Sequence, residues 1–439
     1  MRTVDWTISI IIQDDGVYKN EIDLDLLFAV RNAPVKPSVR YIIFRFDQKT
    51  KRSVIQTTTG DSLTGKTAEI LIDSNDSLYN LQTLANFFNL YVLSEAGEEI
   101  QSKRHMVITW GHGAGIGLFY DTEINNTVDL GLEGLTEFSN NNTKPLDDTH
   151  SPHLITVPGF RTALLKSFGK KKAKIDLLLC MNCYMQNFET GYALRDLVTV
   201  LITSEKMLPF AGFNYASLFN LLSKKDLTQD LDKIYDEVLN GFEKKYAETS
   251  TQTDYSIYKQ VFKTIPLSLS VNKLIYYDSV FKIVNKLAGL FTKNIEVKIN
   301  NKRLSDLLIL VRLTCKDVSP GNNTGFIDFV CFIEKIIEEI KTEDRVHPLL
   351  KKLEIQYHYL IEISKDSVYK ILNDPRLTID PNNTPRFFSI FFPNSDDAAI
   401  SNEIRTIYNT THGNDARYFK RIKPWVEFIN VYYAKRFGG

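Results

Sequence analysis

Lys174 to Tyr215 reads KIDLLLCMNCYMQNFETGYALRDLVTVLITSEKMLPFAGFNY, and this stretch decides the fold. Ile175 to Cys180 is a short, almost wholly apolar run, which is typical of a strand buried on both faces of a parallel sheet. A helical pattern follows from Gln186 to Asp196, and Leu197 to Thr203 is a second apolar run rich in β-branched residues. Strand, helix and strand in this order form a βαβ unit. Its first turn places the thiol of Cys183 at the carboxyl edge of a sheet, where open α/β sheets bind ligands.

A second strand end carries a candidate base for this thiol. His105 to Trp110 is strand-like and runs into GHGAGIG at residues 111–117, so His112 stands among glycines that let the backbone approach a substrate closely. A cysteine becomes a nucleophile when a base lies nearby. Because neighbouring parallel strands end at the same edge of a sheet, we expect Cys183 and His112 to meet there.

Composition limits the classes of partner. The chain has 439 residues, is 43% apolar and carries 53 basic and 53 acidic side chains, so its formal charge is +0. Without a basic excess, a nucleic-acid partner is not expected. No apolar run approaches the ~18 residues of a membrane span. The N-terminal residues read as a strand rather than a signal peptide, which favours a cytoplasmic location unless a leader has been removed.

Strands alternate with helices in the first half of the chain, which predicts an α/β fold with a mostly parallel sheet flanked by helices. The remaining strands expected there cover residues 6–13 and 39–46, and the helices cover 23–30, 76–88 and 158–168, with a charged turn at 95–103. The polar segment Thr136 to His153 interrupts this pattern and is expected to be an exposed loop.

After residue 222 the sequence pattern changes from alternating strands and helices to mostly helical segments. Helices are expected at 227–246, 280–291, 326–340 and 346–372 with a strand at 264–271, then a strand at 386–392 and a terminal helix at 418–437. We therefore expect a caspase-like peptidase core at 1–222, a mostly helical region at 223–380, and a returning strand and C-terminal helix at 381–439 that pack on the core.

With these motifs in place, the chain resembles the clostripain family of cysteine peptidases, which has a caspase-like fold. The family pattern around the base is matched by WGHGAG at residues 110–115. The pattern around the nucleophile is matched by Cys183-Tyr184-Met185, Glu189, Tyr192, Leu194, Asp196, Ser204-Glu205, Pro209, Gly212 and Tyr215. Further likenesses at residues 6–8, 267–271 and 388–393 extend the resemblance over nearly the whole chain.

The resemblance implies an endopeptidase that acts on a protein or peptide substrate without a metal or other cofactor. Cys183 is the expected nucleophile and His112 the expected acid and base, while the backbone N–H groups of Gly113 and Cys183 form the oxyanion hole. The expected substrate-binding residues are Met181, Asn182, Ser204 and Glu205. Family members are often activated by self-cleavage, for which residues 136–153 are the expected place here, and an activating partner is an alternative.

One departure concerns specificity. The family carries an acid before the nucleophile to pair with a basic substrate side chain, and this chain has Met181 there. Since burying an unpaired cation is costly, the first pocket is not expected to be strictly specific for Arg or Lys. Glu205, or Asp226 from the helical region, could restore the charge. The consequence of Asn182, where the family has alanine, does not follow from the sequence.

Three other interpretations remain open. A catalytically silent binding or scaffold protein could keep the same fold. Cys180 and Cys183 also form a CxxC pair, which is compatible with thiol–disulfide exchange, whereas a zinc ribbon would need a second close pair that Cys315 and Cys331 do not supply. The glycine-rich loop lacks the Lys-Ser/Thr of a phosphate loop, and a buried cysteine or a satisfied loop histidine is the ordinary explanation for each residue alone.

Overall fold

The computed structural model describes residues 2–16, 22–34, 38–58, 68–72, 77–95, 98–119, 154–224, 230–246, 267–315, 317–318, 325–374, 384–392, 407–409 and 413–437. The predicted loop and cleavage segment 136–153, and Asp226, lie outside these residues.

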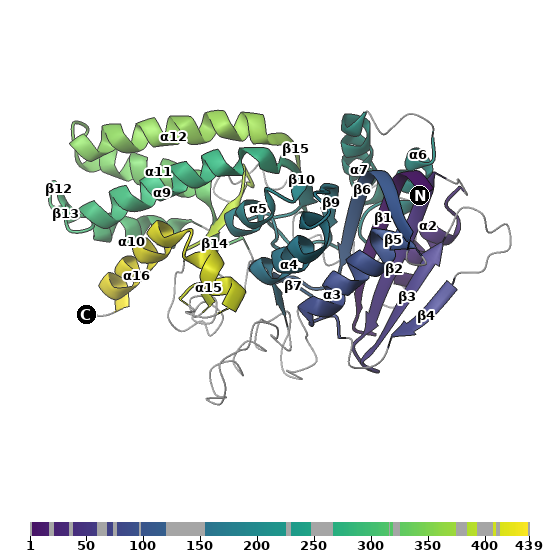
Figure 1. The fold of residues 1–439 in the computed structure, drawn as a ribbon. Coiled ribbons are helices and arrows are strands. Elements are labelled where there is room, and N and C mark those ends of the chain that lie inside the picture. The colour runs from purple at the N-terminus through teal and green to yellow at the C-terminus, as the bar shows by residue number, and fades with distance from the viewer. Residues whose placement is uncertain are drawn as a thin grey trace.

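A mixed ten-stranded sheet forms the centre of the molecule, with the order β15-β11-β10-β9-β6-β1-β2-β3-β4 and β5 paired to β6 (Figure 1). Its strands are β1 (Arg2–Asp14), β2 (Val39–Asp47), β3 (Arg52–Thr58), β4 (Ala68–Ile72), β5 (Ser94–Glu95), β6 (Glu98–Trp110), β9 (Ile175–Cys180), β10 (Val198–Thr203), β11 (Ser268–Lys273) and β15 (Val368–Asn373). The five central strands from β10 to β2 are parallel, and antiparallel strands extend the sheet on both sides. This is the predicted α/β fold with a mostly parallel sheet.

The strand order decides what gathers at the carboxyl edge. Ile12 of β1 is aligned with Trp110 of β6, and Thr109 of β6 is aligned with Cys180 of β9. The strands β1, β6 and β9 therefore end at nearly the same level of the sheet. The loop with His112 lies between the residues that follow β1 and the residues that follow β9.

Two groups of helices cover the two faces of the sheet. One group is α3 (Leu81–Phe87), α4 (Val157–Leu164) and α5 (Phe188–Leu194), and the other is α2 (Leu27–Arg31), α6 (Tyr215–Leu222) and α7 (Leu231–Tyr246). Within β2, Phe44 packs on Phe87 of α3 and Tyr41 packs on Phe219 of α6. Residues 41 and 44 point to opposite faces of a strand, so the two groups lie on opposite sides.

A mostly helical region extends from the β15 side of the sheet (Figure 1). It contains α9 (Tyr277–Asn294), α10 (Leu304–Thr314), α11 (Phe329–Glu343), α12 (Pro348–Ser367), α15 (Gly413–Phe419) and α16 (Lys423–Phe437). The described elements also include three short ribbons: β7 (Gly117–Leu118) with β8 (Ile155–Thr156), β12 (Lys298–Ile299) with β13 (Lys302–Arg303), and β14 (Phe326–Asp328) with β16 (Ser389–Phe391). Short π- or 3-10-helical segments lie at Ile22–Leu26, Phe88–Val92, Leu165–Gly169 and Leu274–Tyr276. No helix in the described parts of the chain is long and apolar enough to cross a bilayer.

Several element predictions were wrong in detail. The charged segment predicted as a turn up to residue 103 already belongs to β6 from Glu98, since pairing with β1 extends the strand. The helix predicted up to residue 372 ends at Ser367, because Val368–Asn373 pairs with β11 as an edge strand. The helix predicted from residue 326 starts at Phe329, after β14, and Asp328 caps it by accepting the Cys331 N–H at 2.6 Å.

The ribbon of β14 and β16 holds the segment that follows the candidate nucleophile. Ser389 N–H donates to the Gln186 carbonyl at 3.0 Å, and Gln186 Nε2 donates to the Phe387 carbonyl at 3.0 Å. Nearby, the buried carboxyl of Glu189 accepts a hydrogen bond from the hydroxyl of Tyr408. Residues close to the C-terminus thus support the first turn after β9.

Candidate active site

His112 lies two residues beyond β6, on a loop that the end of β1 holds from one side. Its N–H donates to Gln13 Oε1 at 3.0 Å, and a Cβ at Gly111 would lie 2.6 Å from that oxygen, so this position requires glycine. The imidazole Nε2 lies 2.9 Å from Asp15 Oδ2. On another side, the ring contacts Phe210 edge-on with 5.0 Å between centroids.

Asn182 joins the histidine loop to the cysteine loop. Its Nδ2 donates to the His112 carbonyl at 2.8 Å, while its Oδ1 accepts from Thr109 Oγ1 at 2.6 Å and from the Cys180 thiol at 3.4 Å. The side chain is fully buried, and these three bonds use its donor and acceptor atoms. An alanine here, as in the family pattern, would make none of them.

Gly113 brings the backbones of the two loops into direct contact. A Cβ at Gly113 would lie 2.5 Å from the Cys183 carbonyl oxygen and 2.7 Å from the Cys183 nitrogen. Only a residue without a side chain allows this approach. The residue after the nucleophile, Tyr184, adopts a positive φ of 63°, which is uncommon for a residue with a Cβ and turns the chain sharply. The structure therefore brings Cys183 and the His112 loop together at one edge of the sheet.

The segment Ser204–Phe210, here called the cover segment, lies over the Cys183 thiol. Leu208 N–H donates to Cys183 Sγ at 3.3 Å, and Sγ lies 3.9 Å from the Leu208 carbonyl oxygen. The Tyr184 N–H donates to the Lys206 carbonyl at 3.3 Å, which fixes the segment alongside the cysteine loop. Cys183 is 8% exposed, and burial raises the pKa of its thiol to about 11. In this conformation the thiol is covered and protonated at neutral pH.

Cys180 differs from Cys183 in its surroundings. It is the last residue of β9, is buried, and donates to Asn182 Oδ1. Burial raises the pKa of this thiol to about 11 as well. It has the environment of a structural side chain inside the sheet, which does not favour the thiol–disulfide exchange interpretation.

Met181 lies against the turn that follows the cover segment. A Cβ at Gly212 would lie 3.1 Å from Met181 Cε and would also meet the hydroxyl of Tyr215, and Gly212 has a φ of 63°. This turn is held from behind by α7, where the buried Lys245 Nζ donates to the carbonyls of residues 211 and 213 at 2.6 and 3.1 Å. The Tyr246 hydroxyl donates to the Gly212 carbonyl at 2.8 Å. The end of the Met181 side chain thus lies beside the Gly212 turn.

Ser204 and Glu205 are both buried in the cover segment. Ser204 Oγ accepts the Lys206 N–H at 2.8 Å, and its carbonyl accepts the Gln186 N–H at 3.0 Å. Burial raises the pKa of Glu205, and the carboxyl of Asp328 at the start of α11 raises it further. The substrate-binding assignment of these residues stays a prediction.

Sequence reasoning missed Gln13 and Asp15 as parts of the site. The signal was a polar cluster directly after the first strand, but its relevance depends on β1 being the neighbour of β6. The contacts of Leu208 and Phe210 were missed for a similar reason, because they come from the segment after β10. Within the described residues, no cluster of three or more His, Cys, Asp or Glu side chains is arranged to hold a metal ion.

The sequence pattern that defines the clostripain family matches residues 36–400. No curated protein sequence matches the chain.

Solved structures of low sequence identity share the fold. A secreted C11 cysteine protease from Bacteroides thetaiotaomicron called iotapain has 13% identity and a TM-score of 0.55, covering 85% of this chain and 87% of its own. An inactive zymogen C11 protease from Parabacteroides distasonis has 15% identity and a TM-score of 0.57, covering 96% and 99%. A secreted C11 cysteine protease from B. thetaiotaomicron in complex with an irreversible peptide inhibitor has 13% identity and a TM-score of 0.58, covering 95% and 99%.

The family pattern spans most of the chain, and the sheet and flanking helices have the architecture of these proteases. The resemblance inferred from the cysteine and histidine motifs is confirmed: this chain belongs to the clostripain family of cysteine endopeptidases.

Proposed function

We propose that the protein hydrolyses peptide bonds with Cys183 as nucleophile and His112 as general acid and base. The observation that carries this proposal is the junction of the two loops. The Asn182 amide binds the His112 carbonyl at 2.8 Å, and the Gly113 backbone lies against that of Cys183. Loops joined in this way support the proposed pairing of the Cys183 thiol with the His112 imidazole, on which the proton exchange depends.

In the first step, Cys183 passes its proton to His112 and the thiolate attacks the carbonyl carbon of the substrate. A C–S bond forms, and the resulting oxyanion receives hydrogen bonds from the N–H groups of Gly113 and Cys183, each worth ~3 kcal/mol in comparable sites. The C–N bond then breaks, and imidazolium donates its proton to the leaving amine. The product of this half-reaction is a thioester on Cys183.

In the second step, His112 takes a proton from water and the hydroxide attacks the thioester carbonyl. The C–S bond breaks, the acid product leaves, and the proton returns to the Cys183 sulfur. Each proton thus moves between sulfur, imidazole, amine and water, and no external oxidant or reductant is needed.

The cover segment must move before a substrate can bind. Leu208 occupies the hydrogen-bonding positions around Sγ, and Phe210 lies on the His112 ring. Ordering a peptide in the site would replace these contacts. We propose that the structure represents a closed state and that opening is coupled to substrate, to an activating partner or to self-cleavage within residues 136–153.

The first substrate pocket is proposed to be uncharged. Met181 takes the place of the family's acid and contacts the Gly212 turn. A polarizable, flexible side chain accepts apolar and small uncharged partners with graded preference, since one methylene changes binding by only about 1–3 kcal/mol. Strict specificity for Arg or Lys is therefore not expected.

A catalytically silent binding protein is the second candidate, and the burial of Cys183 favours it. A biotinylated peptide acyloxymethyl ketone library distinguishes the two, with Leu, Met, Lys or Arg next to the warhead. The proposal expects covalent labelling of the wild type, no labelling of Cys183→Ala, and unchanged labelling of Cys180→Ser. Equal labelling of wild type and Cys183→Ala contradicts the nucleophile assignment, and labelling that depends on Cys180 supports thiol exchange.

A further inference from the structure

We infer that Asp15 is the positioning residue for His112, so that the site operates as Cys183, His112 and Asp15. This inference rests on the proposed function. It assigns a role to a carboxylate directly after β1, a strand that carries neither the nucleophile nor the base.

The geometry of the pair is that of a directed hydrogen bond. Asp15 Oδ2 lies 2.9 Å from His112 Nε2, within the normal range for a charge-assisted bond. The Asp15 side chain is 4% exposed and that of His112 is 20% exposed, so solvent screens this pair little. Gln13, two residues earlier, holds the backbone N–H of His112, which fixes the ring and the main chain from the same strand end.

The chemistry of a carboxylate then determines the tautomer of the ring. An ionised carboxylate only accepts hydrogen bonds, so Nε2 carries a proton in this pair. Nδ1 is left as the nitrogen that exchanges a proton with Cys183 and with the leaving amine. The negative charge also stabilises the imidazolium that forms when the thiol loses its proton.

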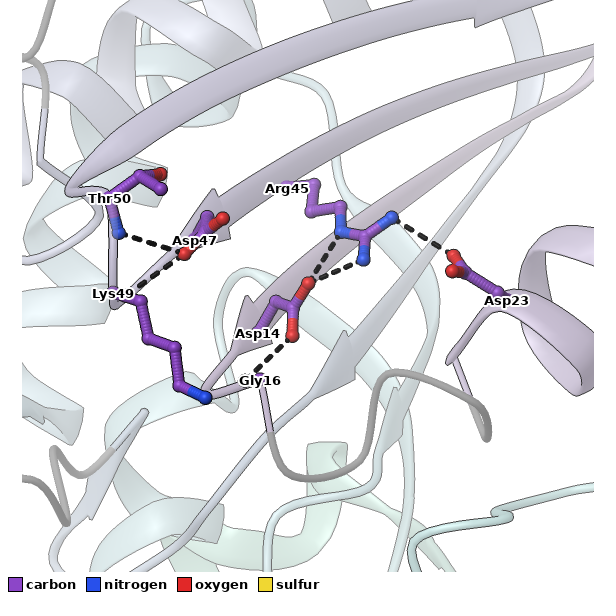
Figure 2. Close-up of polar contacts among 7 residues, drawn as sticks. All are labelled: Asp14, Gly16, Asp23, Arg45, Asp47, Lys49 and Thr50. Atoms are coloured by element: carbon purple, nitrogen blue, oxygen red, sulfur yellow. Dashed lines mark hydrogen bonds and ion pairs between the residues drawn. The ribbon is translucent and has the colours of Figure 1, made fainter.

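The neighbouring carboxylate, that of Asp14, makes different contacts. Asp14 accepts hydrogen bonds from Arg45 Nε and from the Gly16 N–H, each at 2.9 Å, and Arg45 also reaches Asp23 at 3.0 Å (Figure 2). Figure 2 shows this network at the end of β1, with the Lys49 side chain beside Gly16. Charged side chains at the end of β1 include Asp14, Arg45 and Asp23, which pair with one another, and Lys49 beside Gly16, while the Cys183 backbone lies against Gly113, next to His112.

These adjacent acids provide a matched test. Asp15→Asn keeps an acceptor oxygen for Nε2 but removes the charge, and Asp15→Glu restores the charge on a longer side chain. Asp14→Asn weakens the ion pair with Arg45 one residue away and serves as the control. Each protein is assayed for kcat and KM against pH with a fluorogenic peptide, for the pH dependence of Cys183 alkylation by iodoacetamide, and for thermal stability.

We expect kcat of Asp15→Asn to fall by about 10- to 100-fold with KM within about twofold. The acid limb of its pH profile should move to lower pH, because the imidazole must be neutral to accept the thiol proton and has lost the carboxylate that favours its protonated form, and alkylation should show the same displacement. Asp15→Glu should recover part of kcat and return the acid limb toward its wild-type position. Asp14→Asn should lower Tm and leave the acid limb in place.

The inference is overturned if Asp15→Asn keeps the wild-type kcat and the wild-type pH dependence of kcat. It is also overturned if Asp14→Asn shifts that pH dependence by the same amount. If Asp15→Asn does not fold, an Asp15→Glu protein with a wild-type Tm that lacks any recovery of kcat overturns it as well. Undiminished hydrolysis by Cys183→Ala overturns the proposed function itself. Hydrolysis that depends on Cys183 but keeps its pH profile in Asp15→Asn overturns only the role of Asp15.

Discussion

Replacing Gly113 by alanine tests the contact on which the proposed site depends. The added methyl would lie 2.5 Å from the Cys183 carbonyl oxygen, 2.7 Å from the Cys183 nitrogen and 2.9 Å from the Asn182 carbonyl carbon. All three atoms belong to the backbone, so no side-chain rotation relieves the clash. Reaching an ordinary contact of 3.4 Å requires the two loops to separate by 0.9 Å, which is the difference between 3.4 and 2.5 Å.

Two consequences follow from this separation. Overpacking of this kind costs about 1–3 kcal/mol of folding free energy. A displacement of ~1 Å between reacting groups lowers the rate by about 100-fold, because the thiol, the imidazole and the oxyanion donors no longer align. We therefore expect Gly113→Ala to lose about two orders of magnitude in kcat/KM while remaining folded.

The assay pairs kcat/KM on a fluorogenic peptide with urea unfolding of the same preparations. Gly289→Ala is the control, because a Cβ at this position in α9 meets no atom within 4 Å, and alanine favours a helix over glycine by about 1 kcal/mol. It should keep full activity and gain stability. A Gly113→Ala protein with kcat/KM within about twofold of the wild type would refute the reasoning.

Three further predictions concern specificity, stability and access. Met181→Asp should gain cleavage after Arg and lose cleavage after Leu in a fluorogenic series that varies only that position, and an unchanged profile would remove residue 181 from the pocket. Burial raises the pKa of Glu189 from its ordinary 4.5 to about 7, so the protonated carboxyl contributes stability that is complete below 4.5 and is lost as pH rises through 7. Glu189→Gln should remove this loss of about 3 kcal/mol, measured as urea unfolding free energy at about pH 5 and about pH 8. Because the thiol of Cys183 is covered, its alkylation should be slow at neutral pH and become faster toward pH 11. Phe210→Ala should make alkylation faster at neutral pH. Equal rates for this variant and the wild type would show that the cover segment does not limit access.

The sequence predicted the two loops of the site but not their surroundings. Residues 105–110 and 175–180 are apolar runs whose local pattern alone indicates buried strands, so the positions of His112 and Cys183 at strand ends followed directly. The order of the strands in the sheet cannot be inferred from such local patterns. That β1 lies beside β6 is a property of the folded sheet, and the contact between Asp15 and His112 appears only with it.

Tertiary pairing also explains the elements that were missed or misassigned. Residues 52–58 read RSVIQTT, which is too polar for a buried strand, yet they form β3 because β2 and β4 pair with them on both sides. Residues 368–373 continue the helical pattern of α12, but pairing with β11 makes them a strand. In both cases a neighbour from elsewhere in the chain overrides the local preference.

The ribbon of β14 and β16 determines when, during synthesis, the contacts around the site can form. Ser389 Oγ donates to the Gln186 carbonyl at 3.1 Å, although these residues are 203 positions apart in the chain. A ribosome that adds about 5–20 residues per second completes this partner about 10–40 s after the nucleophile loop has been made. During that interval the nascent chain contains both Cys183 and His112 but lacks the strand that closes the loop from behind. The contacts around the segment that follows Cys183 are thus completed only after residues far along the chain have been made.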